Sequence, residues 1–467
     1  MNPSTRYTIR VALIVALGGF LMGFDASVIS GVVTFIEPEF NLSTLQLGWA
    51  VASLTLTATL AMMVSGPLSD RFGRRAVLKW AAVLFMISAV ASALAPNYFS
   101  LVAARMLGGL GVGAALIIAP MYIAELSPPD IRGRMVSFNQ LNIVIGISVA
   151  FFSNYLILSL GQSDLAWAQT LRLGDWNWRW MLGVEALPAV FYFLALFSVP
   201  ESPRWLVMHG RNADALDVMA RVSDRERAEA ELADVLESLD AEADEERGTL
   251  RELFQPAMKL VLTIGVMVAV LQQITGINSV FFYAPMIFEQ SGIGTDASFM
   301  QAVLVGLVNL VFTVLAIMLI DRLGRKPFIM GGLLGYAVVA VAFYFTTDVM
   351  VLITIRFFQG IFSAMMMPVL QAYVGDITPD GREGLTMGIF NLATFVGLGM
   401  GPLFGGVISD HWNLQAAFAC MGALALTGFL FSSLGLPAVR HEKAFRHYTA
   451  PRAWGQLLHD RELLGLF

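Results

Sequence analysis

Apolar residues gather along the chain in twelve runs separated by more polar segments. Most runs are close to the twenty residues that an α-helix needs to cross about 30 Å of hydrocarbon. The pattern therefore predicts an all-α membrane protein with twelve transmembrane helices. The expected spans cover residues 11–36, 47–68, 76–95, 98–124, 135–160, 180–199, 257–288, 298–320, 327–346, 349–374, 385–408 and 414–436.

The composition is typical of an integral membrane protein, since 57% of the 467 residues are hydrophobic and 14% are charged. A soluble chain of this length needs more polar surface. The first run follows Arg6 and Arg10, as a secretory signal would. It is too long for a signal, contains Asp25 and precedes eleven further runs, so we expect it to be retained.

The remaining composition excludes several classes of protein. A single cysteine, Cys420, rules out an internal disulfide framework, and all five histidines fall outside the expected spans. We therefore expect no metal site and no cofactor. No stretch resembles a nucleic-acid-binding module, and no grouping of nucleophile, base or metal ligands suggests an enzyme.

Lysine and arginine are concentrated in alternate connections between the spans. By the positive-inside rule these connections face the cytoplasm, which places both termini there. The expected location is the cell (inner) membrane, which the chain crosses many times. The longest connection, residues 200–255, is rich in Asp, Glu, Arg and Ala with helical periodicity, and we interpret its charges as a solvated surface.

The two halves of the chain repeat one another. The stretch SDRFGRRAV contains Asp70, and IDRLGRKPF contains the matching Asp321, 251 residues later. The same offset relates Arg105 to Arg356 and Glu125 to Asp376. Two copies with an even number of spans have the same orientation, as in transporters whose halves rock around a central site. A duplicated channel, sensor or enzyme is the alternative.

The repeat defines the expected domain organisation of the chain. Residues 1–199 form a six-helix half, and residues 200–255 form a cytoplasmic helical linker. A second six-helix half covers residues 256–436, and a cytoplasmic tail covers residues 437–467.

The repeated D-R-x-G-R motif suits a tight turn between two helices. Glycine lets the backbone turn, while Asp and Arg hold the loop to neighbouring helix ends through charge-assisted hydrogen bonds. Anchoring by positive charge alone would explain the arginines but neither the Asp nor the Gly. The expected gating residues in and near the motifs are Asp70, Arg71, Gly73, Arg74, Arg75, Glu125, Arg132, Glu201, Arg204, Asp321, Arg322, Gly324, Arg325 and Asp376.

Three charged residues lie inside the expected spans of the first half. At 1.5 Å per residue, Asp25 lies roughly 16 Å, Arg105 roughly 10 Å and Glu185 roughly 8 Å from the outer end of its span. All three are in the outer half of the membrane and can meet in one polar cluster. Charges at such depth are costly, so they indicate function. The alternative is a static ion pair that only fixes helix packing.

An arginine beside a carboxylate favours its ionised form, whereas a dry site disfavours it. Opening and closing of the site would therefore change the affinity of Asp25 for a proton. Neutral amides occur within other spans, and each offers a donor and an acceptor, as a hydroxyl-rich neutral solute requires. The substrate-binding residues expected from this reasoning are Gln140, Gln272, Gln273, Asn278 and Asn309, with Phe24 and Tyr283 as aromatic candidates.

Five motifs carry a resemblance that spans nearly the whole chain. GPLSDRFGRR, RMLGGLGVG, YIAELSPPDIRGRMVSFNQ, VPESPRWL and QQITGINSVFFYAP resemble, in order, the signatures of the sugar porter family within the major facilitator superfamily. The first half in particular resembles the family's bacterial proton:xylose symporters. The resemblance implies the superfamily's twelve-helix fold and alternating access. It also implies proton coupling by Asp25, Arg105 and Glu185.

By the same resemblance, five of the amides match sugar-contacting positions of the family: Gln140, Gln272, Gln273, Asn278 and Asn309. The second half departs from the pattern. Gln371 stands where the family has a tryptophan in the tenth span, so the resemblance implies that Gln371 also binds substrate. Thr394 and Phe395 replace an amide–tryptophan pair in the eleventh span. The P-E-T-K-G signature after the last span is absent.

We therefore expect a secondary active transporter that couples uptake of a sugar (pentose, hexose or related polyol) to protons and functions as a monomer in the lipid bilayer. The departures in the second half leave open a uniporter, or a proton antiporter of a non-sugar metabolite or drug, on the same fold. A membrane sensor is a further alternative, but no large soluble signalling domain is visible.

Overall fold

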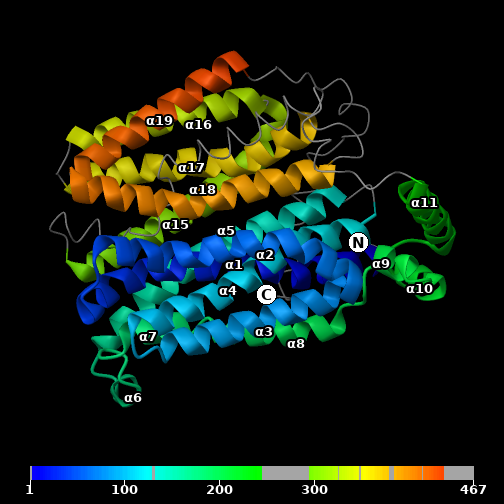
Figure 1. The fold of residues 1–467 in the computed structure, drawn as a ribbon, viewed down its shortest axis with the longest axis horizontal. Helices are drawn as coiled ribbons and strands as arrows, with labels where there is room; N and C mark the ends of the chain where they lie inside the picture. The colour runs from blue at the N-terminus through cyan, green and yellow to red at the C-terminus, as the bar shows by residue number, and fades with distance from the viewer. Residues whose placement is uncertain are drawn as a thin grey trace.

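A computed structural model describes residues 3–128, 132–244, 285, 294–323, 325–345, 349–377, 383–412 and 414–435. Within these ranges the chain is helical and contains no β-strand. The long helices run side by side along the longest axis of the molecule (Figure 1).

Five long helices follow the first five apolar runs: α1 (Pro3–Phe40), α2 (Thr44–Phe72), α3 (Arg74–Ala93), α4 (Tyr98–Leu126) and α5 (Arg132–Gly161). Ser43 and Asn97 form capping boxes at the starts of α2 and α4. Gly73 separates α2 from α3 with a φ of 97°, a conformation that favours glycine. α1 extends beyond the expected span 11–36 at both ends, so those boundaries were too narrow.

The sixth expected span, 180–199, is a broken helix. It consists of α7 (Asn177–Gly183), α8 (Ala186–Ala195) and the 3-10 turn η1 (Leu196–Ser198), and the short α6 (Ala166–Thr170) precedes it. Pro188 has no N–H to donate to the carbonyl group of Val184, so the regular ladder of hydrogen bonds is interrupted there. The interruption leaves Glu185 between α7 and α8.

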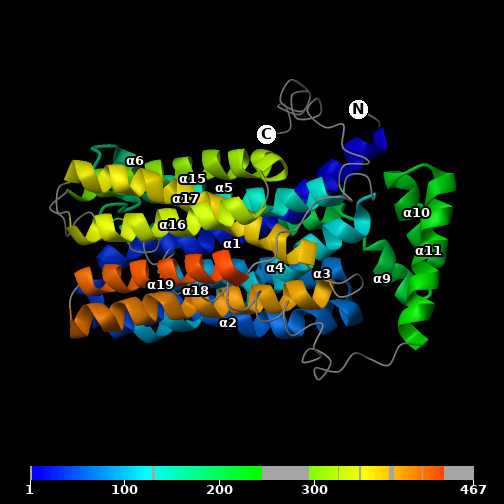
Figure 2. The ribbon, with the colours of Figure 1, turned by 90° about the horizontal axis from the view of Figure 1, so that it is seen from above.

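Three shorter helices come next: α9 (Pro203–Met208), α10 (Asn212–Val222) and α11 (Arg225–Asp244). They stand together at one end of the long helices (Figure 2). We call this end the linker end, and the opposite end, where α6 lies, the distal end (Figure 1). The rest of the expected linker, to residue 255, lies outside the described residues.

The second half contributes α15 (Thr295–Leu323), α16 (Arg325–Phe345), α17 (Val349–Ile377), α18 (Glu383–His411) and α19 (Leu414–Gly435). In the described part of the chain, nine helices are long and apolar enough to cross a membrane. The 29-residue helices α17 and α18 occupy the expected tenth and eleventh spans. Apart from residue 285, the expected seventh span lies outside the described residues.

The long helices form two layers, which we call the N-terminal bundle (α1–α5, α7 and α8) and the C-terminal bundle (α15–α19) (Figure 1). The bundles meet where α5 packs against α15 and α2 packs against α18. In the first contact, the hydroxyl group of Ser148 donates to the carbonyl oxygen of Gly306 over 3.0 Å. Towards the distal end, the rings of Phe35 and Phe299 lie 6.2 Å apart between α1 and α15.

Within the N-terminal bundle, α1 and α5 approach each other closely. A Cβ atom at Gly23 would strike the backbone oxygen of Ile143, and one at Gly146 would strike the backbone oxygen of Phe20. Because both residues are glycines, the backbones of α1 and α5 can come into direct contact. This contact fixes the middle of α1, which carries Asp25.

Candidate functional site

Asp25 and Arg105 form a buried ion pair in the middle of the N-terminal bundle. The guanidinium Nη1 of Arg105, on α4, donates to Oδ1 of Asp25, on α1, over 3.3 Å. Each residue is 1% exposed. Arg105 also donates to the backbone oxygens of Asp25 and of Ala50, on α2. One guanidinium group thus joins three helices around the carboxylate.

Glu185 is the third charged member of this site. It is 2% exposed and interacts electrostatically with both Asp25 and Arg105. The broken sixth span places it there, because Glu185 occupies the turn between α7 and α8. Oδ2 of Asp25 and Oε1 of Glu185 are buried and have no hydrogen-bond partner in the described part of the chain.

Two ionised carboxylates and one arginine together carry one net negative charge. Binding of a proton to either carboxylate makes the group neutral. When both carboxylates are ionised they repel each other, while the arginine attracts each of them. Leaving a buried carboxylate oxygen without a donor is costly, so a proton on one of the two relieves the site. The arrangement is chemically suited to binding and releasing a proton within the membrane.

The polar residues expected to bind substrate are only partly described. Gln140 lies half-buried on α5, Asn309 buried on α15, and Gln371 half-buried on α17. Phe24 is buried on α1 beside Phe20, with ring centroids 6.1 Å apart. No hydrogen bond joins any two of the three described amides. Four further expected residues lie outside the described residues: Gln272, Gln273, Asn278 and Tyr283.

The departures in the eleventh span have a structural explanation. The hydroxyl group of Thr394 is buried and donates to the backbone oxygen of Phe390, one turn earlier on α18. Phe395 is 5% exposed and packs into the hydrophobic core of the N-terminal bundle. Phe395 therefore contributes to the contact between α18 and the N-terminal bundle.

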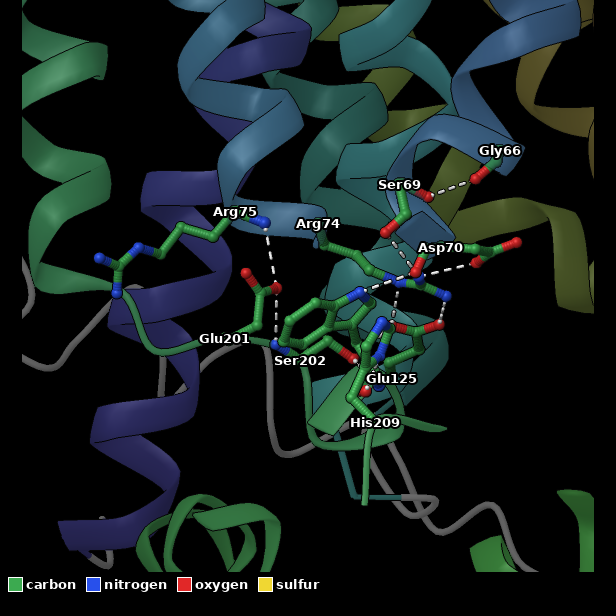
Figure 3. A network of polar contacts seen from close by, with 10 residues as sticks. Gly66, Ser69, Asp70, Arg74, Arg75, Glu125, Glu201, Ser202 and His209 are labelled. Carbon is green, nitrogen blue, oxygen red and sulfur yellow. Dashed lines mark hydrogen bonds and ion pairs between the residues drawn. The ribbon is translucent and has the colours of Figure 1, made fainter. Parts of the chain in front are cut away.

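At the linker end, Arg74 is the centre of a polar network (Figure 3). Its guanidinium group donates to both carboxylate oxygens of Glu125, over 3.1 and 3.0 Å, and to Asp70 over 2.7 Å. Arg74 is buried, although Asp70 is half exposed. The two carboxylates join the α2–α3 turn to the end of α4.

Glu201 fastens the same turn to the segment before α9. Its Oε1 accepts hydrogen bonds from the backbone N–H groups of Arg75 and Ser202, over 3.1 and 3.0 Å (Figure 3). A Cβ atom at Gly73 would lie 2.5 Å from the other oxygen of Glu201, so the turn requires glycine for space as well as for φ. The guanidinium group of Arg75 donates to the backbone oxygen of Val199.

Sequence reasoning missed three members of this network. Ser202 donates its hydroxyl hydrogen to Glu125, and the indole N–H of Trp205 donates to the backbone oxygen of Asp70 over 2.9 Å. The ring of His209 stacks on Trp205 with centroids 4.1 Å apart. All three lie in or just after the VPESPRWL motif, which was the available signal.

The other expected gating residues are less fully defined. Arg71 is exposed and lies over the ring of Phe72, with 5.2 Å between its guanidinium carbon and the ring centroid. Arg204 lies on α9. The structure describes the backbone alone at Arg132, Asp321, Arg322, Arg325 and Asp376, and Gly324 lies outside the described residues.

A second polar network, which the sequence did not indicate, closes the distal end of the N-terminal bundle. Glu39, at the end of α1, accepts hydrogen bonds from the indole of Trp178 and the guanidinium group of Arg179, on α7. Arg179 also donates to the backbone oxygens of Ala93 and Ala95. Trp178 is therefore held at the bundle end.

Comparison with known proteins places these features in context. Residues 11–348 match the family described as Sugar (and other) transporter. Residues 293–467 match the family described as Major Facilitator Superfamily. The first match covers both polar networks and the buried ion pair.

Individual relatives agree with the family matches. The arabinose-proton symporter of Bacillus subtilis (strain 168) is 34% identical over 436 residues, covering 92% of each chain. The D-xylose-proton symporter of Escherichia coli (strain K12) is 37% identical over 418 residues, covering 83% of this chain and 82% of the relative. A partially occluded, inward-open structure of the E. coli xylose transporter XylE superposes with a TM-score of 0.78 at 32% identity, over 92% of this chain and 100% of that one.

Proposed function

We propose that this chain, which belongs to the sugar transporter family of the major facilitator superfamily, carries a sugar across the membrane together with a proton. The observation that supports this most is the buried ion pair of Asp25 and Arg105 beside Glu185. Relatives that are 34% and 37% identical are named proton symporters of arabinose and D-xylose. A pentose is therefore the first substrate to test.

We propose that the sugar binds between the two bundles, near Gln140, Asn309 and Gln371. These amides come from α5, α15 and α17, and α15 packs against both of the other helices. The amides Gln272, Gln273 and Asn278, with Phe24 and Tyr283, complete the proposed site. The replacement of a tryptophan by Gln371 supports a pocket that differs from that of the pentose symporters.

We propose that residues 1–199 and 256–436 are the two halves that rock, joined by the linker 200–255. The linker end faces the cytoplasm of the cell, so that both termini lie on that side of the inner membrane. The concentration of Arg71, Arg74 and Arg75 at this end supports the orientation. We propose that the chain functions as a monomer.

The test is sugar-driven proton movement in proteoliposomes that contain a pH-sensitive dye. Adding D-xylose or L-arabinose outside should acidify the interior, because each sugar enters with a proton. Uniport would give sugar uptake without a pH change, and antiport would give a pH change of opposite sign. Absence of uptake of any sugar or polyol would contradict the proposed function.

A further inference from the structure

Gly108 of α4 lies against both the carboxylate of Asp25 and the hydroxyl group of Ser88, which α3 contributes. A Cβ atom at residue 108 would lie 2.8 Å from Oδ2 of Asp25 and 2.5 Å from Oγ of Ser88. The two polar atoms thus lie within 2.8 Å of one point. They share a space that exists because residue 108 has no side chain.

We propose that Ser88 is a positioning residue for the proton-binding carboxylate of Asp25, an inference that rests on the proposed proton coupling. Arg105 holds Oδ1 of Asp25, whereas Oδ2 lies, like the hydroxyl group of Ser88, against Gly108. Oδ2 is buried and has no partner in the described part of the chain, while Ser88 is 3% exposed. Rotation of the Ser88 side chain is the movement that the proposal requires to bring its hydroxyl group to Oδ2.

The chemistry of a hydroxyl group suits both protonation states of the carboxylate. A serine O–H donates to an ionised carboxylate, and the serine oxygen accepts from the O–H of a protonated one. A guanidinium group has only donors, so Arg105 can donate to Oδ1 in either state but cannot accept a hydrogen bond from a proton on Oδ2. Once its hydroxyl group reaches Oδ2, Ser88 can bond that oxygen with or without the proton, so that Asp25 exchanges a proton without leaving a buried polar atom unpaired.

The surroundings of Asp25 leave few competing groups. In the described part of the chain, Arg105 from α4 and Glu185 from the α7–α8 turn are the charged residues that interact electrostatically with it. In α2, α3 and α5 the charged residues lie towards the linker end, between Asp70 and Lys79 and at Arg132 and Arg134. A change in the response to pH after altering Ser88 can therefore be traced to this site.

The test compares two variants of Ser88, Ser88→Ala and Ser88→Thr. Ser92→Ala is the matched control for Ser88→Ala. Ser92 is buried one turn further along α3. None of the three atoms nearest to the Cβ position of Gly108 belongs to Ser92. Charged acceptors form the stronger hydrogen bonds, so loss of the hydroxyl disfavours the ionised form of Asp25. The alkaline limb of the pH profile of sugar uptake should move up by about one pH unit in Ser88→Ala.

Ser88→Thr, which keeps the hydroxyl group, should retain the wild-type profile, as should Ser92→Ala. Sugar counterflow should stay within about twofold of wild type in Ser88→Ala, because exchange needs no net proton release. A wild-type pH profile in folded Ser88→Ala would overturn the proposal. A shift of equal size in Ser92→Ala would also overturn it, because the effect would then be a general packing change.

A second measurement separates this inference from the proposed function. The infrared carboxyl band that disappears in Asp25→Asn reports the protonation of Asp25 without any transport. Its titration midpoint should move to higher pH in Ser88→Ala and not in Ser88→Thr. If wild type moves no protons with sugar while this band still shifts, the proposed function fails and the role of Ser88 stands. An unmoved band overturns the role of Ser88.

Discussion

At the residue scale, the two buried arginines of the N-terminal bundle have different tasks. Arg74 meets two carboxylates and a backbone oxygen, so its charge is fully compensated at the linker end. Arg105 interacts with two carboxylates, and each of these has one buried oxygen without a hydrogen-bond partner in the described part of the chain. The first arrangement is typical of a fixed clamp, and the second of a site that changes its charge.

Replacing Arg74 by alanine should destabilise the protein, because it strands Glu125 and Asp70. Breaking a buried ion pair by removing one partner costs about 3–5 kcal/mol. The measurement is the Tm of the purified protein in detergent. Arg211→Ala is the matched control, since Arg211 pairs with Asp214 on an exposed surface and should leave Tm unchanged. Equal losses in both variants would contradict the clamp.

Replacing Gln371 by tryptophan should change the ranking of substrates. A large aromatic side chain at this half-buried position of α17 fills space that a bulkier sugar would occupy. Relative uptake of a pentose over a hexose should change by about tenfold. Val338→Trp, on an exposed face of α16, is the control. An unchanged ranking in Gln371→Trp would show that residue 371 does not line the pocket.

At the element scale, the contact between α1 and α5 decides where Asp25 sits. Gly146→Ala should lower stability by about 1–3 kcal/mol, because the new methyl group meets the backbone of Phe20, which cannot move aside. Gly66→Ala on α2 is the control, since nothing lies within 4 Å of its Cβ position. Thermal unfolding of both variants gives the comparison, and a Tm of Gly146→Ala equal to wild type would refute the close contact.

The apolar pattern predicted the described long helices, because each run is long enough to span hydrocarbon. It missed the break at Glu185, although Pro188 was a visible signal. It placed Asp25 and Arg105 where they can meet in one polar cluster, and the two side chains are in contact. The distal network could not be predicted, because Glu39 and Trp178 are 139 residues apart and only the packed fold brings them together.

At the scale of the whole molecule, the bundles are joined at the distal end by a polar contact as well as by the Phe35–Phe299 pair. The amide of Gln162, just after α5, donates to the carboxylate of Asp296, on α15, over 2.7 Å. Alternating access requires the bundles to separate at each end in turn. This contact must therefore break during every transport cycle.

Cross-linking tests that requirement. Gln162→Cys and Asp296→Cys, combined in a Cys420→Ser background, should react with a short reagent that carries two methanethiosulfonate groups and forms a reducible bridge. The bridge should abolish sugar uptake and counterflow, and cleaving it should restore both, because the distal end can open again. Either single cysteine variant, treated in the same way, should transport normally. Full transport by the bridged protein would contradict opening at this point.

The most direct test of proton coupling is a paired measurement on Asp25→Asn proteoliposomes. The amide imitates a permanently protonated carboxyl group, so the loaded site can still reorient but cannot release a proton. Gradient-driven accumulation of sugar should be lost, while counterflow of sugar should continue near the wild-type rate. A static ion pair predicts that both activities fall together with stability. Accumulation at the wild-type level in Asp25→Asn would contradict the assignment of Asp25 as the coupling site.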